Sequence, residues 1–491
     1  MMKIFSSQIR HQWDDFTIQN EPIASVALME RAAKTCTDWL LTHFSGHHFA
    51  IVCGPGNNGG DGLAIARLLH LAHQKISVFK VQSAQHTDDF LTNLKQITSL
   101  GISITENSTD FLKTCAAQTV FIDALFGTGL NKALHGQAAD LVQTLNETPG
   151  IKIAIDIPSG LAADGKLADF SIAFQAMHTL TFQSPKLSFM YPENEVYVGQ
   201  FHVLAIGLSK AFETNTPSMY QYLQAADIDF IKPRAKFAHK GTFGHALLIA
   251  GSKGKMGAAI MAAQACLQSG VGLLTTCCAE IGQDIIQIAV PAAMSKTYED
   301  TIDFDNYTSI GIGPGISTSA EANQILVSLL AQYTKPIVVD ADALSLLGIG
   351  HELSMLSANS ILTPHPKEFD RLFGHSDSRA HQIQKGLDFA AQHQVYILLK
   401  GAHTAIICPE GEVIFNSTGN PAMAKGGSGD VLTGMLTAFL AQGYSSKESC
   451  ILGVYLHGLA ADLALLKTSA WSMLPQDLIA HIGEAFLVVS K

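Results

Sequence analysis

Short apolar runs alternate with stretches of helical apolar spacing along almost the whole chain. The run FAIVCG (49–54) is apolar throughout and ends in glycine, which predicts a buried strand, whereas LMERAAKTCTDWLLTHF (28–44) and LAIARLLHLA (63–72) have the spacing of helices. Later runs repeat this order, for example TVFIDALFG (119–127) and IKIAIDIPSG (151–160). Strands that are apolar on both faces and separated by helices are typical of a parallel sheet between helices, so we predict an α/β fold.

The alternation stops once, near residues 209–226, where the chain is polar, contains a proline and shows no sustained periodicity. A second series then begins with HALLIAGS and continues with runs such as KPIVVDADAL and VYILLKG. In open α/β sheets ligands bind outside the carboxyl ends of the strands, so each series is expected to carry a site there. We predict a Rossmann-like three-layer domain over residues 1–212, a linker over 213–226 and a second α/β domain over 227–491.

Composition narrows the classes of protein and partner. Hydrophobic residues make up 47% of the 491 residues and charged residues 15%, which excludes a disordered chain. The formal charge is −11 without any basic run, which argues against nucleic acid and anionic membrane as main partners but not against small anionic ligands. The eight cysteines contain no CxxC pair, so we expect reduced thiols in a cytoplasmic protein without a targeting segment. The uncharged stretch 256–279 contains Gln and Ser, and we predict a soluble helix, a turn and a buried strand there.

The segment GPGNNGGDG (Gly54–Gly62) follows a predicted strand and precedes a predicted helix. Glycine lets the backbone turn sharply and approach a ligand, and the N-terminus of a helix attracts an anion such as phosphate. The spacing formally satisfies the GxGxxG of dinucleotide-binding dehydrogenases, but the next strand ends in KVQ (80–82), without the acidic residue that holds a ribose. The polar Asn57, Asn58 and Asp61 favour a specific binding loop over a plain turn.

Two later strand ends of the first domain carry side-chain oxygens. Asp123 lies in FIDALFGTG, and Asp156 and Ser159 lie in AIDIPSG. Taken singly, each aspartate could cap a helix or hold a loop. Because the carboxyl ends of parallel strands share one edge of the sheet, together they predict a site that holds a hard cation or performs acid–base chemistry.

In the second domain, GGSGDVL (426–432) precedes a strongly apolar predicted helix. Its glycines and the helix N-terminus predict an anion hole for a transferring phosphoryl group, and Asp430 is placed to accept a proton from a hydroxyl nucleophile. The segment GSKGKMGA (251–258) is not a Walker loop, because its spacing is short and Met256 replaces the Ser or Thr. KGAHT (400–404) favours a contact with nucleotide phosphate, and His365 lies between two prolines that restrict its backbone.

Four segments of the first domain, TIQNEPIASVALMERAA, GPGNNGGDG, FIDALFGTG and IDIPSG, resemble the epimerase module of the NAD(P)H-hydrate repair enzymes, with a match over residues 8–208. The resemblance implies a potassium ion bound by Asn58, Asp123 and Ser159. It also implies contacts with the hydrated cofactor from Asn57, Asn58, Gly59, Gly60, Asp61, Asp156 and the loop Gly127, Thr128, Gly129, Leu130, Asn131, Lys132 and Ala133.

Five segments of the second domain, HKGTFGHALLIAGS, GIGPG, LTPHPKEF, LLKGAHT and NSTGNPAMAKGGSGDVLTG, resemble the ribokinase-like dehydratase domain of the same enzymes over residues 227–490. The resemblance implies ADP as phosphoryl donor, with Mg²⁺ beside it, although the residues alone do not decide between ADP and ATP. It implies that Ala258, Gly315, His365 and Asp430 contact the hydrated cofactor and that Lys400, Gly401, Ala402, His403, Thr404 and Gly429 bind the adenine nucleotide.

The hypothesis that follows is an enzyme that epimerises the R and S hydrates of NADH and NADPH and then dehydrates the S hydrate at the expense of ADP, giving AMP and phosphate. Asp156 is expected to act as acid and base in the first reaction, and Asp430 as base in the second. The expected partners are these small molecules, with no nucleic acid and no membrane, and a homo-oligomer is expected. Two alternatives stay open: a ribokinase-like small-molecule kinase fused to a dinucleotide-binding domain, and a non-catalytic cofactor- or RNA-binding module in the first domain.

Overall fold

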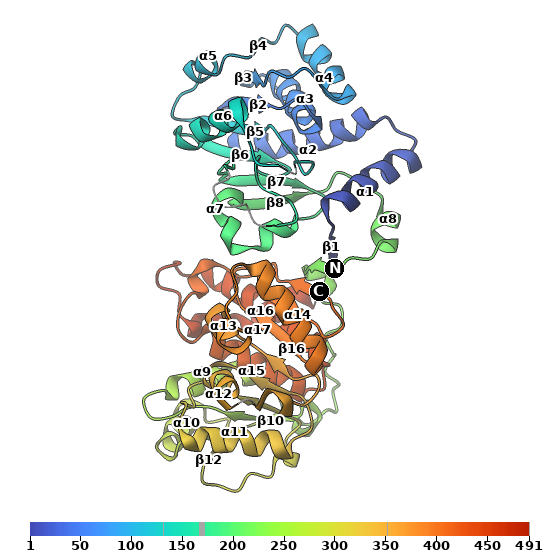
Figure 1. The fold of residues 1–491 in the computed structure, drawn as a ribbon. Coiled ribbons are helices and arrows are strands. Elements are labelled where there is room, and N and C mark those ends of the chain that lie inside the picture. Colours follow the sequence, from blue (N-terminus) through green and yellow to red (C-terminus); the bar gives the residue numbers. More distant parts are fainter. Residues whose placement is uncertain (131, 166–171, 351, 491) are drawn as a thin grey trace. The chain divides into compact units, whose positions relative to one another are not determined.

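A parallel sheet of seven strands runs through the first half of the chain, in the order β4-β3-β2-β5-β6-β7-β8 (Figure 1). The computed structural model describes residues 1–130, 132–165, 172–350 and 352–490, so the predicted cofactor contact of Asn131 lies outside the described residues. The strands are β2 (His48–Cys53), β3 (Lys75–Lys80), β4 (Ile104–Thr105), β5 (Thr119–Ala124), β6 (Ile151–Ile155), β7 (His178–Phe182) and β8 (Gln200–Leu204).

Helices pack on both faces of this sheet, because alternate residues of each central strand point to opposite sides. In β2, Phe49 and Ile51 join one hydrophobic core with residues of α2 and α3, whereas Ala50 and Val52 join a second core with residues of α6. The predicted α/β class of the first half is therefore confirmed. The helices are α1 (Ser7–Asn20), α2 (Ser25–Phe44), α3 (Asn57–Leu71), α4 (Asp88–Ser99), α5 (Ser108–Lys113), α6 (Gly136–Glu147), α7 (Glu195–Val198) and α8 (Lys210–Asn215).

A second sheet has eleven strands in the order β1-β9-β18-β17-β16-β15-β14-β13-β10-β11-β12, of which β1 comes from the start of the chain and the others from residues 220–415. All neighbouring pairs among the strands β10 to β16 are parallel. Strand β17 pairs antiparallel with both β16 and β18. The strands are β1 (Met2–Ile4), β9 (Tyr220–Tyr222), β10 (His245–Ile249), β11 (Leu273–Cys278), β12 (Met294–Thr297), β13 (Ser309–Ile312), β14 (Ile337–Val339), β15 (Ile361–Leu362), β16 (Tyr396–Leu399), β17 (Ala405–Ile407) and β18 (Val413–Phe415).

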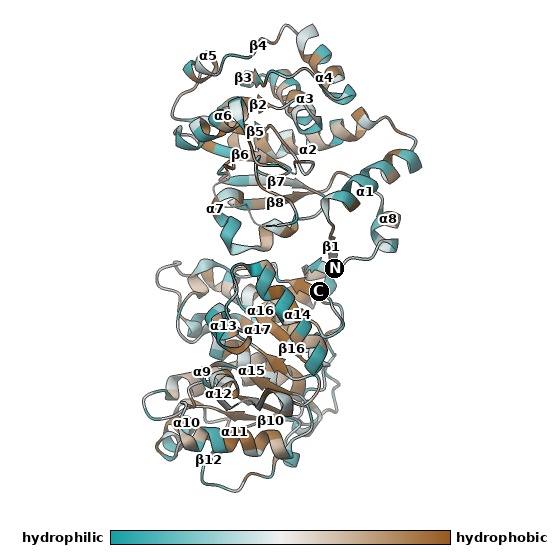
Figure 2. Cartoon of the chain, in the orientation of Figure 1, coloured by the Kyte–Doolittle hydropathy of each residue, from teal (hydrophilic) through white to brown (hydrophobic). Residues whose placement is uncertain are grey.

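Helices pack against this second sheet. Helices α9, α15, α16 and α17 pack against one another, and their apolar residues share cores with strands of the sheet. Figure 2 shows brown apolar strands among helices that carry teal polar residues, which is the layering expected of an α/β protein. The helices are α9 (Met256–Gln268), α10 (Gln283–Ala289), α11 (Ala320–Gln332), α12 (Ala341–Gly350), α13 (Pro366–Phe373), α14 (Arg379–His393), α15 (Ser428–Ala441), α16 (Ser446–Leu465) and α17 (Pro475–Val489).

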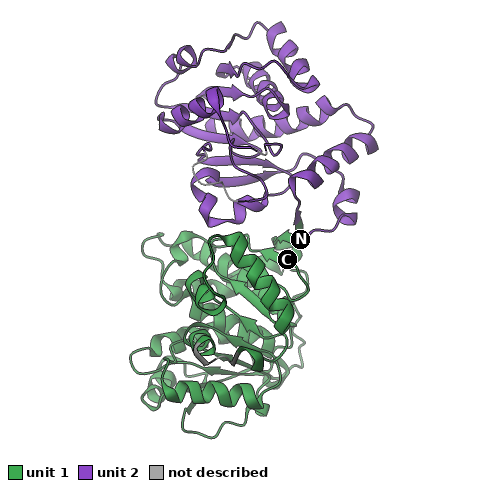
Figure 3. Ribbon diagram, viewed as in Figure 1, with its two compact units in different colours: residues 1–2, 219–491 green, residues 3–218 purple. Residues whose placement is uncertain are grey.

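The chain divides into two compact units, one of residues 3–218 and one of residues 219–491 together with residues 1–2 (Figure 3). The segment 213–226, predicted as a linker, holds the end of α8 and all of β9. Strand β9 pairs in parallel with β18 and so belongs to the second sheet.

The apolar stretches of the second unit lie in its hydrophobic cores. The segment 256–279 folds as α9, a turn and β11, as predicted. A different helix, α16, is long and apolar enough to cross a membrane, but 72% of its apolar window is buried inside the protein. Its Leu452, Leu456 and Ala460 belong to the hydrophobic core that α15 and α17 share, and burial in this core accounts for its composition.

Candidate active sites

The first site lies where the strand order reverses, between β2 and β5. From β2 the chain adds β3 and β4 on one side of the sheet, and β5 to β8 on the other. The Gly54 N–H donates to the Ala124 carbonyl at 3.0 Å, so the loops after β2 and β5 lie against each other. A Cβ at Gly54 would lie 1.8 Å from the Leu125 carbonyl oxygen, and only glycine fits. Open α/β sheets bind their ligands at such reversals.

The next glycines of the loop let α3 pack closely against its neighbours. A Cβ at Gly59 would lie 1.8 Å from the Gly54 carbonyl oxygen, and one at Gly60 would lie 2.8 Å from the sulfur of Met29. Gly62 faces Ala124 of β5 in the same way, at 2.6 Å. The absence of side chains at Gly59 and Gly60 therefore has a packing reason, besides the backbone contacts with the hydrated cofactor predicted for them.

We expect Gly59→Ala to destabilise residues 3–218, because the new Cβ meets a backbone carbonyl that cannot move aside. The overpacking penalty should be about 3 kcal/mol and lower the Tm of this unit by roughly 6–12 °C. Gly56→Ala is the matched control, since a Cβ at Gly56 meets nothing within 4 Å, and its Tm should stay within about 2 °C of the wild type. Calorimetry of both variants checks this, and equal Tm values would contradict it.

A cluster of buried oxygens lies beside the loop. The carboxylate of Asp123 accepts hydrogen bonds from the Ser159 hydroxyl (2.7 Å), the Ser159 N–H (2.8 Å) and the Leu125 N–H (3.1 Å). Burial nevertheless raises the pKa of Asp123 to about 6. Among the described residues, neither amide atom of the buried Asn58 side chain has a hydrogen-bond partner. A Cβ at Gly127 would lie 3.5 Å from the Asn58 Cβ, so the loop after β5 covers this side chain.

Asp156 follows β6 in a left-handed conformation, with φ of 64°. Its N–H donates to the Leu180 carbonyl (2.7 Å), and its carboxylate forms an ion pair with Lys186, whose side chain is 1% exposed. The Lys186 ammonium also donates to the Thr181 hydroxyl at 2.7 Å. Burial lowers the pKa of Lys186 to about 8, although Asp156 opposes this shift. The Lys186 ammonium can therefore lose its proton more readily than an exposed lysine.

A cavity of about 190 Å³ opens at this edge of the sheet. Burial, and then the charge of Asp156, raises the pKa of Asp61 well above its usual range. The cavity therefore offers both a proton donor and charged groups to a ligand. Four predicted cofactor contacts line it: Asn57, Asp61, Thr128 and Asp156.

The remaining predicted contacts in the described part of the first unit are not among the residues that line this cavity. Gly127, Thr128 and Leu130 are half-buried, whereas Gly129, Lys132 and Ala133 are exposed in the loop between β5 and α6. The exposed members of this loop can reach a ligand only from its solvent side.

The second site lies at the other reversal of strand order, between β10 and β13. The Gly251 N–H donates to the Pro314 carbonyl at 2.9 Å, and the Gly313 N–H donates to the Ile249 carbonyl at 3.2 Å. Gly315 has φ of +63°, and a Cβ there would lie 3.2 Å from the Ala258 Cβ. The structure thus brings together Ala258 and Gly315, the two contacts predicted for the hydrated cofactor in these loops.

The N-terminus of α15 carries the glycine-rich motif of the second unit. Gly427 caps the helix with φ of 107°, and Asp430 lies in the first turn. Burial, together with the charge of Asp340, raises the pKa of Asp430 to about 7, although Lys400 opposes this. The Nε2–H of His457, on α16, donates to the Ser428 carbonyl at 2.9 Å, and burial lowers the pKa of His457 to about 4. A neutral imidazole therefore fixes this helix start.

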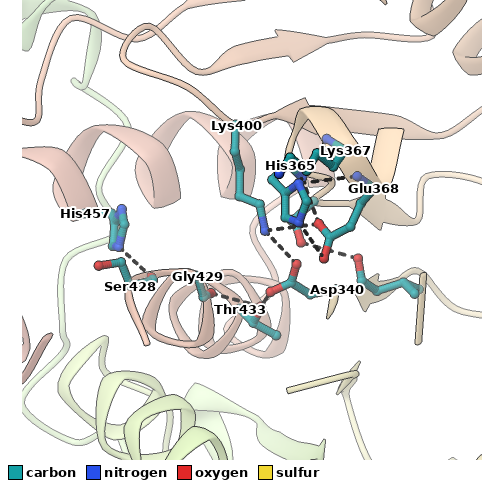
Figure 4. A network of polar contacts seen from close by, with 11 residues as sticks. Asp340, His365, Lys367, Glu368, Lys400, Ser428, Gly429, Thr433 and His457 are labelled. Atoms are coloured by element: carbon teal, nitrogen blue, oxygen red, sulfur yellow. Dashed lines mark hydrogen bonds and ion pairs between the residues drawn. The ribbon is translucent and has the colours of Figure 1, made fainter. Parts of the chain in front are cut away.

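Lys400 lies over the start of α15 within a network of polar side chains (Figure 4). Its ammonium lies 2.9 Å from one Asp340 oxygen, and the Thr433 hydroxyl donates to the other at 2.7 Å. Burial disfavours the charged lysine, but Asp340 and then Glu368 outweigh it and raise the pKa of Lys400. A Cβ at Gly429 would lie 3.5 Å from the Lys400 nitrogen, so a fixed cation faces the anion hole.

His365 is held by a helix cap rather than by its flanking prolines alone. Its Nδ1 accepts hydrogen bonds from the N–H groups of Lys367 (3.0 Å) and Glu368 (3.3 Å), while the Glu368 carboxylate accepts from the His365 N–H at 2.8 Å (Figure 4). Because Nδ1 accepts, the neutral ring carries its proton on Nε2. The side chain is 44% exposed, and its Nε2 lies 3.5 Å from the Glu368 carboxylate.

The predicted nucleotide contacts from Lys400 to Thr404 form the turn between β16 and β17. The Thr404 hydroxyl donates to the Gly401 carbonyl at 3.1 Å, and the His403 Nδ1–H donates to the Asn416 carbonyl at 3.0 Å. The turn is thereby held in one conformation. Because Lys400 also reaches Gly429, the structure places the two predicted nucleotide-binding segments next to each other.

Sequence reasoning missed several groups that the structure places in these sites. In the first unit they are Arg10, Asp14 and Lys186, which line the cavity. In the second they are Asp340, Glu368, Thr433 and His457, which surround Lys400 and the start of α15. Asp340 and Lys186 each follow a predicted strand and could have been found by their position, but the other residues have no local signal.

Two family models match the two units separately, whereas known relatives match most of the chain. The family described as YjeF-related protein N-terminus matches residues 25–188, and the family described as NAD(P)H-hydrate dehydratase matches residues 246–484. A bifunctional NAD(P)H-hydrate repair enzyme of Moorella thermoacetica is 32% identical, over 95% of this chain and 93% of its own length. Another, of Thermofilum pendens, is 33% identical over 84% of this chain and 83% of its own length.

A solved structure resembles the second unit. A ribokinase-like superfamily protein of Enterococcus faecalis is 30% identical, covers 56% of this chain and 99% of that protein, and gives a TM-score of 0.51. The ribokinase-like fold predicted for the second half is thereby confirmed.

Proposed function

We propose that this chain converts hydrated NADH and NADPH back to the intact cofactors by two reactions at two sites. The chain belongs to the family of bifunctional NAD(P)H-hydrate repair enzymes. Residues 3–218 interconvert the R and S hydrates, and residues 219–491 dehydrate the S hydrate. The observation that carries the proposal is that each unit has its own glycine-lined site at its own reversal of strand order, with acid–base groups beside it.

In the first reaction, the hydroxyl on C6 of the damaged nicotinamide ring must leave and return. The lone pair of the ring nitrogen can expel it as water when an acid protonates it. Asp156 is the acid and base that we assign to this step, because it lines the cavity and forms an ion pair with the buried Lys186. General acid–base catalysis requires such a group within hydrogen-bonding reach of the proton that moves.

We further propose potassium as the cation of the first unit. Hard cations are bound by carboxylate, amide and hydroxyl oxygens, and Asp123, Asn58 and Ser159 offer one of each kind. The Asn58 amide is buried without a partner among the described residues, and the pKa of Asp123 is raised by burial, so both fit a cation between them. A bound ion would supply positive charge that holds the loops after β2 and β5 in place.

In the second reaction, Asp430 takes the proton of the C6 hydroxyl, and the hydroxyl oxygen attacks the terminal phosphorus of ADP, releasing AMP. The N–H groups at Gly429 and the Lys400 ammonium compensate the charge of the transferred phosphoryl group. The ring nitrogen then expels phosphate, C5 loses a proton, and the C5–C6 double bond of NAD(P)H is restored. We assign His365, whose partly exposed side chain is held by its helix cap, to a contact with the bound cofactor.

Mg²⁺ is proposed as the ion that enters with the nucleotide. This ion keeps several waters and usually binds through one or two carboxylates together with substrate phosphates. Asp342 is a candidate carboxylate, since its partners among the described residues are the half-exposed Lys255 at 2.9 Å and the Ser317 N–H. When bound, Mg²⁺ would neutralise phosphate charge during transfer.

We also propose that the protein is located in the cytoplasm. All eight cysteines lie in the described part of the chain and are unpaired, which supports the reducing cytoplasm. The expected homo-oligomer stays a prediction.

The proposal is tested by supplying the full-length chain with pure R or S hydrate of NADH and following absorbance at 340 nm. The S hydrate should be recovered only with nucleotide, and ADP should serve at least as well as ATP. The R hydrate should be recovered by the same chain, and more slowly when tetramethylammonium replaces potassium. No recovery would contradict the proposal, and a stable phosphorylated hydrate without NADH would identify a kinase instead.

A further inference from the structure

We propose that Asp14 is a second catalytic residue of the epimerase reaction, acting on the hydrated ring from a different wall of the cavity than Asp156. This assignment rests on the epimerase function proposed for residues 3–218. It adds a residue of α1, a helix that precedes the segment matched by the family description.

Helix α1 forms one wall of the cavity that holds Asp156. The sheet edge contributes Asp156, Lys186 and the loop after β2, whereas α1 contributes Asp14 among others. Two carboxyl groups thus reach the same cavity from unrelated parts of the chain. A ligand that fills the cavity would lie between α1 and the strand ends.

The structure fixes the face of α1 that carries Asp14. Arg10, Trp13 and Thr17 share this face, because residues three, four and seven apart are neighbours on a helix. The buried Arg10 guanidinium donates to the hydroxyl (2.8 Å) and the carbonyl (3.1 Å) of Ser184. The Trp13 Nε1–H donates to the Ser209 carbonyl (2.8 Å), and the Ser209 N–H donates to the Thr17 hydroxyl (2.9 Å). Asp14 is therefore held toward the cavity by its neighbours on the helix.

Asp14 has no structural task that would explain its position. Within the residues that the structure describes, its carboxyl group takes part in no hydrogen bond and no ion pair. Burial, and then the charge of Asp156, raises the pKa of Asp14 to about 7, against Lys186 and Arg10, with a small contribution from Asp15. Asp61, Asp89 and His11 also line the cavity. A half-buried carboxyl group whose pKa is raised costs stability at neutral pH, and such a cost is typical of functional sites.

The chemistry of epimerisation calls for two such groups. Inversion at C6 requires water to leave from one face of the ring and to add to the other. In one direction, the first carboxyl group gives its proton to the departing hydroxyl while the ring nitrogen forms a double bond to C6. Water then attacks C6 from the opposite face, gives a proton to the second carboxylate, and the lone pair returns to nitrogen. Solvent exchange of the two protons restores the starting state, and the reverse reaction exchanges the two roles.

Asp14→Asn tests the assignment in the full-length chain. Pure S hydrate is incubated without nucleotide, and formation of the R hydrate above the uncatalysed background is measured by chromatography. We expect the epimerisation rate constant to fall about 100-fold or more, since general acid–base catalysis contributes about 10²–10⁴-fold. Nucleotide-dependent dehydration of the S hydrate by the same variant should be unchanged, and Asp14→Glu should keep part of the epimerase activity.

Two further measurements separate catalysis from folding. Removing a carboxyl group whose pKa is raised takes away a cost that is fully present above pH 7, so the Tm of Asp14→Asn at pH 8 should equal or exceed that of the wild type. Asp38→Asn, an exposed change of the same kind on α2, should leave both activities and the Tm unchanged.

Three results would overturn the assignment. Epimerisation by Asp14→Asn above about one tenth of the wild-type rate would remove Asp14 from the chemistry and leave the proposed function intact. A lower Tm at pH 8 together with lost epimerisation would give Asp14 a structural role. If the wild type itself did not accelerate exchange between the hydrates, the proposed function would fall and this assignment with it.

Discussion

Asp430→Asn is expected to lower nucleotide-dependent dehydration of the S hydrate by about 10³-fold, in the range of a lost general base, while leaving epimerisation unchanged. Asp430 lies in the first turn of α15 beside Lys400, where the hydroxyl of a bound hydrate would meet the phosphoryl group. Asparagine keeps the shape of the side chain and cannot accept the proton. Initial rates with ADP and pure S hydrate measure the effect, and Asp388→Asn, an exposed change on α14, is the matched control.

The pH dependence of the wild type belongs to the same prediction. Because burial raises the pKa of Asp430 to about 7, kcat/KM for the S hydrate should fall about tenfold per pH unit below that value. The folded protein holds this proton up to about pH 7, whereas the unfolded chain releases it near 3.8, so the carboxyl group lowers stability increasingly as the pH rises between these values. Asp430→Asn should therefore not lower the Tm at pH 8. Dehydration near the wild-type rate would remove Asp430 from its role as base.

Asp156→Asn should have the opposite effect on the two activities, with repair of the R hydrate reduced by about 10²–10⁴-fold and repair of the S hydrate retained. Asparagine is chosen because it tolerates the left-handed backbone that Asp156 adopts, so the loop keeps its path. Absorbance at 340 nm with each pure hydrate and ADP separates the two steps. Equal recovery of both hydrates by the variant would show that Asp156 is not required.

Loss of Asp156 also leaves the buried Lys186 without its partner, which costs about 3–5 kcal/mol when one member of a buried pair is removed. The double variant Asp156→Asn/Lys186→Met removes this buried charge. Its Tm should recover toward that of the wild type, while repair of the R hydrate should stay lost. A double variant that regained R-hydrate repair would assign the effect of Asp156 to folding.

The sequence was sufficient to predict elements whose signal is local. The apolar runs that end in Gly, Asp or His are the parallel strands. The loop after β2 lies so close to the loop after β5 that no side chain fits at Gly54. Asp123 and Ser159 follow neighbouring strands, and the structure joins them by hydrogen bonds. These predictions depended only on the rule that parallel strands end at one edge.

The residues that sequence reasoning missed depend on contacts between distant segments. Asp14 lies on a helix of ordinary composition. The hydrogen bonds of its helix neighbours to Ser184 and Ser209 turn this helix so that Asp14 lines the cavity. His457 lies in the apolar α16 and holds the start of α15 through the Ser428 carbonyl. No sequence motif predicts this contact. Asp340 follows a strand without any motif around it, and its two partners come from 60 and 93 positions away in the sequence.

The contacts between α1 and Ser209 limit how the two activities can be separated genetically. A fragment that stops before Ser209 would lose both hydrogen bonds that anchor Trp13 and Thr17. It would also lose the carbonyl groups of Glu213 and Thr216 that hold Lys3. An excised epimerase half must therefore extend through Ser218, and a shorter gene product would test a misplaced α1 rather than the enzyme.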